Sequence, residues 1–241
     1  MSEIKLSIIF PCYNEAENIE NIISRVESLL QECDDDVEII LVDNGSTDST
    51  NEVLQTKIQD SILPNLKSIK IENNVGYGFG IMEGVRAATG EVIAWTHADL
   101  QTDPKDVTEA FKEYSKNSNY PKCILKGKRI GRNLFDTLFT AGMSFLSTLL
   151  LRKRLSDVNA QPKMFHRSFL KKLSDPPKDF SLDLYLLFQA RAHNYPILEY
   201  PVHFGKRLHG EAKGGGTLRG KLKLIRRTWG YMVDLKRNLD I

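Results

Sequence analysis

Two spacings of hydrophobic residues alternate along the first hundred positions. Short apolar runs at Lys5–Phe10, Val37–Val42, Leu66–Ile71 and Val92–Trp95 predict four buried strands. Residues 16–31 instead carry apolar side chains three and four positions apart, which predicts an amphipathic helix. That apolar set is Ile19, Ile22, Ile23, Val26, Leu29 and Leu30.

Two further helices fill the remaining gaps between the predicted strands. One follows the second strand and runs to about Lys57, with Ser46 or Asp48 as its expected N-cap. The other starts in the glycine-rich stretch 76–80 and ends near Ala88, before Gly90. Strand and helix therefore alternate, which predicts an α/β fold with a mostly parallel sheet and helices on both faces.

The alternation gives way to an apolar helical pattern near Asn133. We therefore expect a main domain over 1–216, containing an apolar helix at 134–154, and a basic amphipathic helix at 217–241. The segment 134–154 ends in Arg152-Lys153-Arg154, as a helix lying in a membrane interface would. Packing in the core or against a second copy of the chain is the alternative for both helices.

Composition adds little to the predicted fold class, but it bears on partners and cellular compartment. The chain has 241 residues, 41% hydrophobic residues and a net charge of +2, so its charge gives no indication of a nucleic-acid partner. The three cysteines are widely spaced, which favours a reduced, cytoplasmic compartment. Residues 1–5 lead directly into a strand-like run, so we expect no signal peptide, and the apolar segment 137–151 is too short and polar for a transmembrane helix.

Polar side chains gather where the fourth apolar run ends. Ligand-type residues follow Trp95 at alternating positions: His97, Asp99 and Gln101. Because open α/β sheets bind ligands at the carboxyl ends of their strands, we expect a divalent cation and a phosphate-bearing substrate there.

The motifs at the strand ends resemble those of glycosyltransferase family 2, which has the GT-A fold. The matching segments are Pro11-Cys12-Tyr13-Asn14-Glu15, Asp43-Asn44-Gly45-Ser46-Thr47-Asp48, Asn74-Val75-Gly76-Tyr77-Gly78, Ala87-Ala88-Thr89-Gly90-Glu91 and the run from His97 to Pro104. Within that family the order is most similar to the polyprenyl-phosphate sugar transferases related to dolichol-phosphate mannose synthase. The glycines at 76, 78 and 80 lack dinucleotide-binding spacing and indicate close backbone packing beside the site.

The resemblance implies a nucleotide-sugar donor, with either uracil or guanine as the base. Asp43 then matches the aspartate that reads the base, and Glu15 lies near the ribose. The nucleoside loop is matched by Pro11, Tyr13, Asn14 and Glu15. If the resemblance fails at this point, Asp43 is a turn residue and Asp48 a cap.

The resemblance also assigns the metal. The family's Asp-x-Asp pattern is matched by His97-Ala98-Asp99, with Gln101 at another ligand position, so Mn²⁺ or Mg²⁺ is the expected cofactor. His97 stands where the family has aspartate. It either shifts the metal preference towards Mn²⁺, or hydrogen-bonds the diphosphate or a neighbouring loop, or marks a site that has lost activity.

Four further residues match catalytic positions of the family. Arg129 would face an anionic group, or lie in a solvated basic turn. Asp183 would contact the sugar or orient the acceptor, or simply begin a helix. Arg207 and Lys213 would close over the diphosphate in a glycine-rich lid. Asp157 and Gln161 would line the acceptor side.

The function implied is a metal-dependent, inverting transfer of a sugar to a polyprenyl phosphate at the cytoplasmic face of a membrane, with peripheral attachment. A phosphate acceptor is already anionic and needs no strong base. A surface-glycan or other hydroxyl acceptor is the alternative, with Asp183 as the base. The second alternative is a non-catalytic protein that binds nucleotide sugars.

Overall fold

The computed structural model describes residues 4–33, 36–61, 63–131, 155–203, 205, 226 and 229–233. Its strands are β1 (Leu6–Cys12), β2 (Val37–Asn44), β3 (Leu66–Ile71), β4 (Val92–Trp95), β5 (Ile124–Ile130), β6 (Lys163–His166) and β7 (Ile197–His203). Its helices are α1 (Ala16–Glu32), α2 (Thr50–Asp60), α3 (Tyr77–Ala87), α4 (Lys105–Lys116), α6 (Leu182–Ala192) and the 3-10 helix η1 (Arg167–Lys172).

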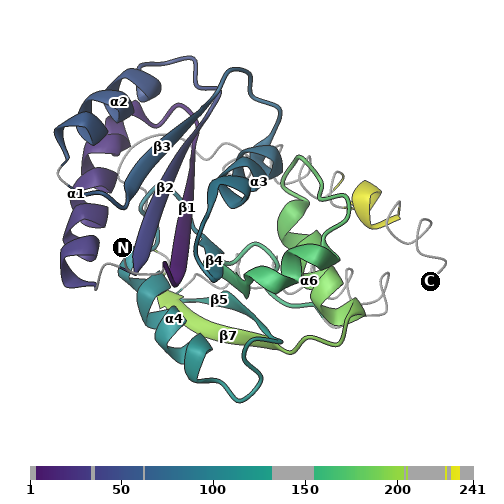
Figure 1. The fold of residues 1–241 in the computed structure, drawn as a ribbon. Coiled ribbons are helices and arrows are strands. Elements are labelled where there is room, and N and C mark those ends of the chain that lie inside the picture. Colours follow the sequence, from purple (N-terminus) through teal and green to yellow (C-terminus); the bar gives the residue numbers. More distant parts are fainter. Residues whose placement is uncertain are drawn as a thin grey trace.

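The strands form one seven-stranded sheet in the order β3-β2-β1-β4-β6-β5-β7 (Figure 1). Only β6 runs against its neighbours β4 and β5, so the other six strands share one direction. The predicted α/β fold with a mostly parallel sheet is confirmed. Because six strands end at the same edge, this edge gathers the segments that follow them.

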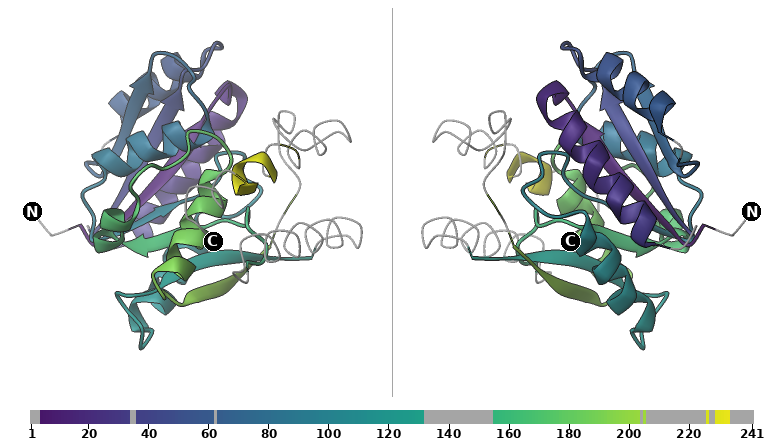
Figure 2. Two further views of the ribbon diagram at one scale, coloured as in Figure 1. Left: turned by 90° about the vertical axis from the view of Figure 1, so that its right-hand side faces the viewer. Right: turned by 90° about the vertical axis from the view of Figure 1, so that its left-hand side faces the viewer.

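Two hydrophobic cores lie on opposite faces of the sheet because side chains alternate along each strand. Helices α1, α2 and α4 cover the face that carries Ile8, Leu41 and Ala94. Helices α3 and α6 cover the face that carries Ile9, Val42 and Trp95. Figure 2 shows α1 and α4 in its right view and α6 in its left view.

The predicted elements of the first hundred residues agree closely with the structure. Two strands match residue for residue, Leu66–Ile71 and Val92–Trp95, and the helix predicted over 16–31 is Ala16–Glu32. Helix α2 begins at Thr50 with Ser49 at the N-cap position, one residue later than the predicted Asp48. The Asp48 side chain still accepts the Thr50 N–H, with Oδ1 at 3.0 Å. The Ser46 hydroxyl is engaged elsewhere, by the backbone N–H of Asn14 at 3.0 Å.

Glycines let α3 approach its surroundings closely, as the sequence predicted. A Cβ at Gly78 would lie 2.2 Å from the Pro177 carbonyl oxygen, and one at Gly84 would lie 2.5 Å from Ile9 Cγ2. Helix α3 therefore packs directly on β1 and on the segment before α6, which brings Tyr77 next to that segment.

We expect Gly84→Ala to lower the free energy of unfolding by about 1–3 kcal/mol, because the added methyl group overpacks the contact between α3 and β1. Gly230→Ala is the matched control, since a Cβ there would meet nothing within 4 Å. Urea denaturation of both variants measures the difference. Equal stability of the two variants would contradict the packing described here.

Candidate active site

All seven strands meet at the carboxyl edge of the sheet. Strands β1, β2, β3, β4, β5 and β7 end there, and the antiparallel β6 begins there. The register pairs Cys12 with Asp43, so β1 and β2 end side by side. Strand β4 ends opposite Ile9, and the segment after it starts beside β1, where the Thr96 N–H donates to the Ile9 carbonyl at 3.1 Å.

The loops after β1 and β2 are joined by hydrogen bonds. The Asn14 backbone has a φ of 50°, and its side-chain Oδ1 accepts the Thr47 N–H at 2.8 Å. The Glu15 N–H donates to Thr50 Oγ1 at 2.8 Å, and Glu15 Oε2 accepts from Asn18 at 2.6 Å. The structure thus brings Tyr13, Asn14 and Glu15 beside the loop that follows Asp43.

Asp43 is buried at the end of β2. Its Oδ1 accepts the Ser46 N–H at 3.0 Å, which fixes the carboxylate. Beside it, Asn44 Nδ2 donates to the Gly76 carbonyl at 3.0 Å, and this contact ties the tip of β2 to the start of α3.

The turn after β4 carries the predicted metal ligands. Asp99 is 6% exposed, and its Oδ1 accepts the Gln101 N–H at 3.1 Å across Leu100, whose φ is 55°. The Gln101 side chain donates to the Gly205 carbonyl at 3.1 Å, so this turn is bonded to the segment after β7.

The turn offers donor types that bind divalent cations, namely an imidazole, a carboxylate and an amide oxygen. Burial lowers the pKa of His97, against the opposing effect of Asp99, so the imidazole is neutral and able to bind a metal. No group of three His, Cys, Asp or Glu side chains arranged to hold a metal occurs among the described residues.

Arg129, at the end of β5, forms an ion pair with Asp157. Its Nε donates to Asp157 Oδ1 at 3.0 Å and its backbone N–H to Oδ2 at 3.1 Å, while Nη2 also contacts Oδ1. Although burial acts in the opposite direction, the guanidinium lowers the pKa of Asp157 below its usual value. Arg129 is thus held at the edge of the sheet rather than in a solvated turn.

A buried polar group, hereafter the Asp183 cluster, joins the fourth strand to α6. It consists of Tyr77, Trp95, Gln161, Lys163 and Asp183. Asp183 Oδ1 accepts from Trp95 Nε1 at 3.2 Å and from Gln161 Nε2 at 3.2 Å, and lies 3.4 Å from Lys163 Nζ. Burial and the negative charges of Asp183 and Asp99 raise the pKa of Tyr77 well above its usual value.

The structure brings together most of the residues that the sequence singled out. Pro11, Tyr13, Asn14, Glu15, Asp43, His97, Ala98, Asp99, Gln101, Arg129, Asp157, Gln161 and Asp183 all lie on segments at or next to the carboxyl edge. Arg207, Lys213 and the predicted helix 134–154 lie outside the described residues. Of the predicted helix 217–241, the described Met232 is buried and Trp229 is 43% exposed.

Three members of the Asp183 cluster were not recognised from the sequence as site residues: Tyr77, Trp95 and Lys163. Lys163 lies in a four-residue strand, β6, whose pattern predicted no element. The one available signal was a lysine directly before an apolar pair, which indicates neither burial nor a partner.

A second buried lysine, Lys126 of β5, pairs with Lys163 of β6 in the sheet. Its Nζ lies 3.0 Å from Glu199 Oε1, and Lys128 lies 3.2 Å from Oε2 of the same carboxylate. Burial acts to raise the pKa of Glu199, but its lysine partners and Ser156 lower it to about 2. The carboxylate is therefore retained in its ionised form in the folded protein.

We expect Glu199 to contribute stability above about pH 4.5 that is progressively lost as the pH falls towards 2, because the unfolded chain binds the proton first. Glu199→Gln should flatten this part of the curve of unfolding free energy against pH. The control is Glu113→Gln, at an exposed position of α4. Urea denaturation at stepped pH tests this, and identical acid limbs in native protein and Glu199→Gln would refute it.

Comparison with known proteins supports a common fold and family. Residues 7–174 match the sequence model described as Glycosyl transferase family 2. Undecaprenyl-phosphate 4-deoxy-4-formamido-L-arabinose transferases of Salmonella choleraesuis (strain SC-B67) and Salmonella newport (strain SL254) are each 25% identical over 222 residues. These alignments cover 87% of this chain, and the chain spans 62% of the length of these relatives.

Solved glycosyltransferase structures have the same fold. The mannosyltransferase PcManGT from Pyrobaculum calidifontis, in complex with GDP-Man and Mn²⁺, gives a TM-score of 0.66 at 19% identity, covering 90% of this chain and 59% of that chain. Glucosyl-3-phosphoglycerate synthase from Mycobacterium tuberculosis, with Mn²⁺, UDP and glucosyl-3-phosphoglycerate, gives 0.70 at 19% identity, covering 96% and 79% respectively.

Proposed function

The chain belongs to glycosyl transferase family 2, and on that premise we propose that it moves a sugar from a nucleoside-diphosphate sugar to a polyprenyl phosphate. The observation that carries the proposal is the convergence of the loops after β1, β2 and β4 at one edge of the sheet. The names of the curated relatives support the acceptor class, since they are undecaprenyl-phosphate sugar transferases.

The donor is bound first by its nucleoside. Asp43 Oδ2 accepts an N–H of the base, which suits N3–H of uracil or N1–H of guanine. Asn14 and Glu15, held by Thr47 and Thr50, form the wall beside the ribose. The diphosphate then extends towards the turn after β4.

Asp99 would hold a divalent cation together with His97 or Gln101. A bound Mn²⁺ or Mg²⁺ neutralises the charge that develops on the diphosphate as the bond to the sugar breaks. The neutral His97 suits Mn²⁺ better than Mg²⁺. Solved structures of the same fold contain Mn²⁺, which supports a divalent metal.

The acceptor phosphate would approach past Arg129, in line with the bond that breaks, and the sugar would therefore invert. Its oxygen is already anionic, so the reaction requires no strong base. Arg129 is oriented by Asp157 to meet an anion, while Arg207 and Lys213 are assigned to the diphosphate by the resemblance alone.

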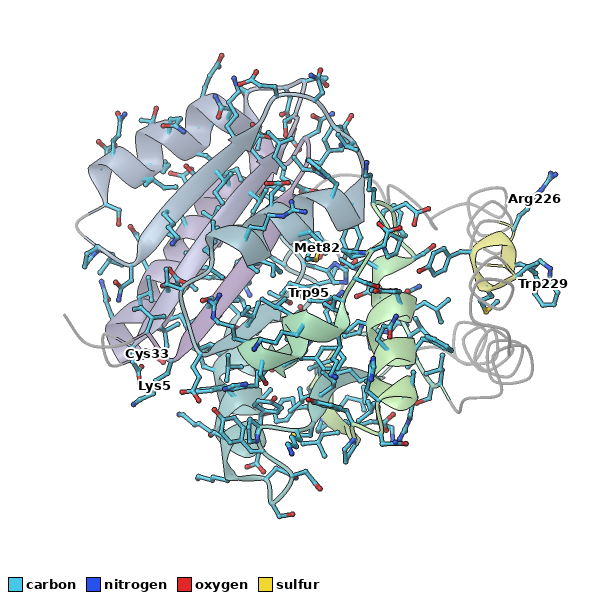
Figure 3. The ribbon with its side chains drawn as sticks, turned by 45° about the vertical axis from the view of Figure 1, so that its right-hand side comes forward. Lys5, Cys33, Met82, Trp95, Arg226 and Trp229 are labelled. Atoms are coloured by element: carbon cyan, nitrogen blue, oxygen red, sulfur yellow. The ribbon has the colours of Figure 1, made fainter. Side chains whose placement is uncertain are left out.

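A lipid acceptor requires contact with a membrane surface. No helix within the described ranges is long and apolar enough to cross a bilayer. Trp229 is 43% exposed and points away from the body together with Arg226 (Figure 3), an arrangement suited to the interface of an anionic membrane. We propose peripheral attachment of this kind at the cytoplasmic face.

We expect transfer from a UDP- or GDP-sugar to a polyprenyl phosphate in detergent, in the presence of Mn²⁺. Radiolabelled sugar moving into the organic phase measures it, with polyprenol lacking the phosphate as the control acceptor. Transfer to polyprenol or to soluble glycans alone would establish a hydroxyl acceptor instead. Tight nucleotide binding without turnover on any donor or acceptor would establish a non-catalytic protein.

We expect Asp99→Ala to weaken Mn²⁺-dependent binding of UDP or GDP by more than about 100-fold, since loss of an outer-shell partner alone costs about 10–100-fold. Asp99→Asn keeps an oxygen for the Gln101 N–H and separates loss of charge from loss of the turn. Asp103→Ala is the exposed control, four residues further on. Isothermal titration calorimetry measures all three, and undiminished binding by Asp99→Ala would remove the metal assignment.

A further inference from the structure

Asp183 lies where four other segments converge on α6. Trp95 comes from the end of β4, Gln161 from the segment before β6, Lys163 from β6 and Tyr77 from the start of α3. Gln161 Nε2 reaches both carboxylate oxygens, at 3.2 and 3.3 Å, and also the Tyr77 hydroxyl at 3.0 Å. One carboxylate therefore ties together parts of the chain that are far apart in sequence.

Four members of the cluster are buried, and Tyr77 is partly buried at its edge. Trp95 and Lys163 are fully buried, Gln161 is 1% exposed and Asp183 is 3% exposed. A carboxylate at this depth is stable only with partners, and Asp183 has an ammonium, an indole N–H and an amide. Three donors converge on Oδ1 of this carboxylate, an arrangement that suits a structural anchor.

Trp95 links the cluster to the metal-binding turn. Its ring packs edge-on against Phe165 of β6, with centroids 5.9 Å apart, and its N–H is held by Asp183. Figure 3 shows Trp95 between the sheet and the helices that cover this face. His97 and Asp99 follow two and four residues later, so the side chain held by Asp183 belongs to the last strand residue before the turn.

The charged groups around Lys163 affect its protonation, and its protonation decides whether it forms an ion pair with Asp183. Asp183 and Asp157 favour its charged form, while Lys126 and Arg129 oppose it. Burial and these cations lower the pKa of Lys163 to about 8, so it is still mainly protonated at neutral pH. The ion pair with Asp183 therefore exists near neutrality.

We propose that Asp183 and Lys163 are positioning residues, whose ion pair holds Trp95 and through it the turn that carries Asp99. For its effect on the donor site this inference rests on the proposed function. In this role Asp183 contributes to donor binding, and it does not act as the base of the transfer reaction.

The test is a double-mutant cycle of Asp183→Asn, Lys163→Met and the combined variant. Each single variant leaves one partner unbalanced and should weaken Mn²⁺-dependent binding of UDP or GDP by about 10–100-fold. The combined variant is neutral and should recover most of that loss, both in binding and in transfer. A catalytic base would give the opposite result, since the combined variant would still lack the base and transfer would stay abolished.

The control cycle is Lys67→Met with Glu38→Gln, an ion pair of 2.8 Å between β3 and the start of β2 whose carboxylate is also buried and lies away from the carboxyl edge. It should lower stability without a selective loss of Mn²⁺-dependent binding. Normal nucleotide binding by Asp183→Asn and Lys163→Met would overturn the proposal, as would failure of the combined variant to recover.

A readout that needs no ligand separates this inference from the proposed function. The chain has two tryptophans, so Trp229→Phe leaves Trp95 as the sole indole. In that background each single variant should shift the emission of Trp95, and the combined variant should partly reverse the shift. Absence of nucleotide binding by the native protein would defeat the proposed function alone, whereas unchanged Trp95 emission would defeat the positioning role.

Discussion

The parallel pairing of β1 with both β2 and β4 is the constraint on which the site depends. It brings the ends of β1 and β2 together, because Cys12 pairs with Asp43, and it sets the end of β4 beside β1, because Trp95 pairs with Ile9. Asp43 and Asn44 are the last two residues of β2, and His97 and Asp99 follow β4. The fold thereby concentrates carboxylates, amides and an imidazole at one edge of the sheet.

The antiparallel strand β6 completes this edge from the other direction. Its first residue, Lys163, lies beside Trp95 in the sheet. The lysine ammonium group therefore lies at the edge where the parallel strands end and acidic side chains gather. Two ion pairs lie in this region, Lys163 with Asp183 and Arg129 with Asp157. Buried ion pairs are costly to desolvate, and removal of one partner is more damaging than replacement of both.

Sequence patterns predicted the first half of the fold well and the second half poorly. Long apolar runs such as Leu66–Ile71 and the helical spacing in α1 reflect burial directly, so these elements were identified. Strand β6 has four residues and begins with a lysine, and its place in the sheet follows from tertiary packing rather than from periodicity. Asp43 and Asp99 were identified because they belong to motifs at the ends of recognisable strands. Lys163 and Asp183 are twenty residues apart and belong to no shared motif, so their pairing was recognisable only in three dimensions.

The segments after β1, β2 and β4 are proposed to form one site for a nucleoside diphosphate and a divalent cation. A crystal structure of the protein with UDP or GDP and Mn²⁺, with anomalous scattering recorded for manganese, would locate both ligands. We expect the base beside Asp43 and a manganese peak at Asp99, in contact with the diphosphate. A nucleotide bound elsewhere, or a manganese peak away from the turn after β4, would contradict it.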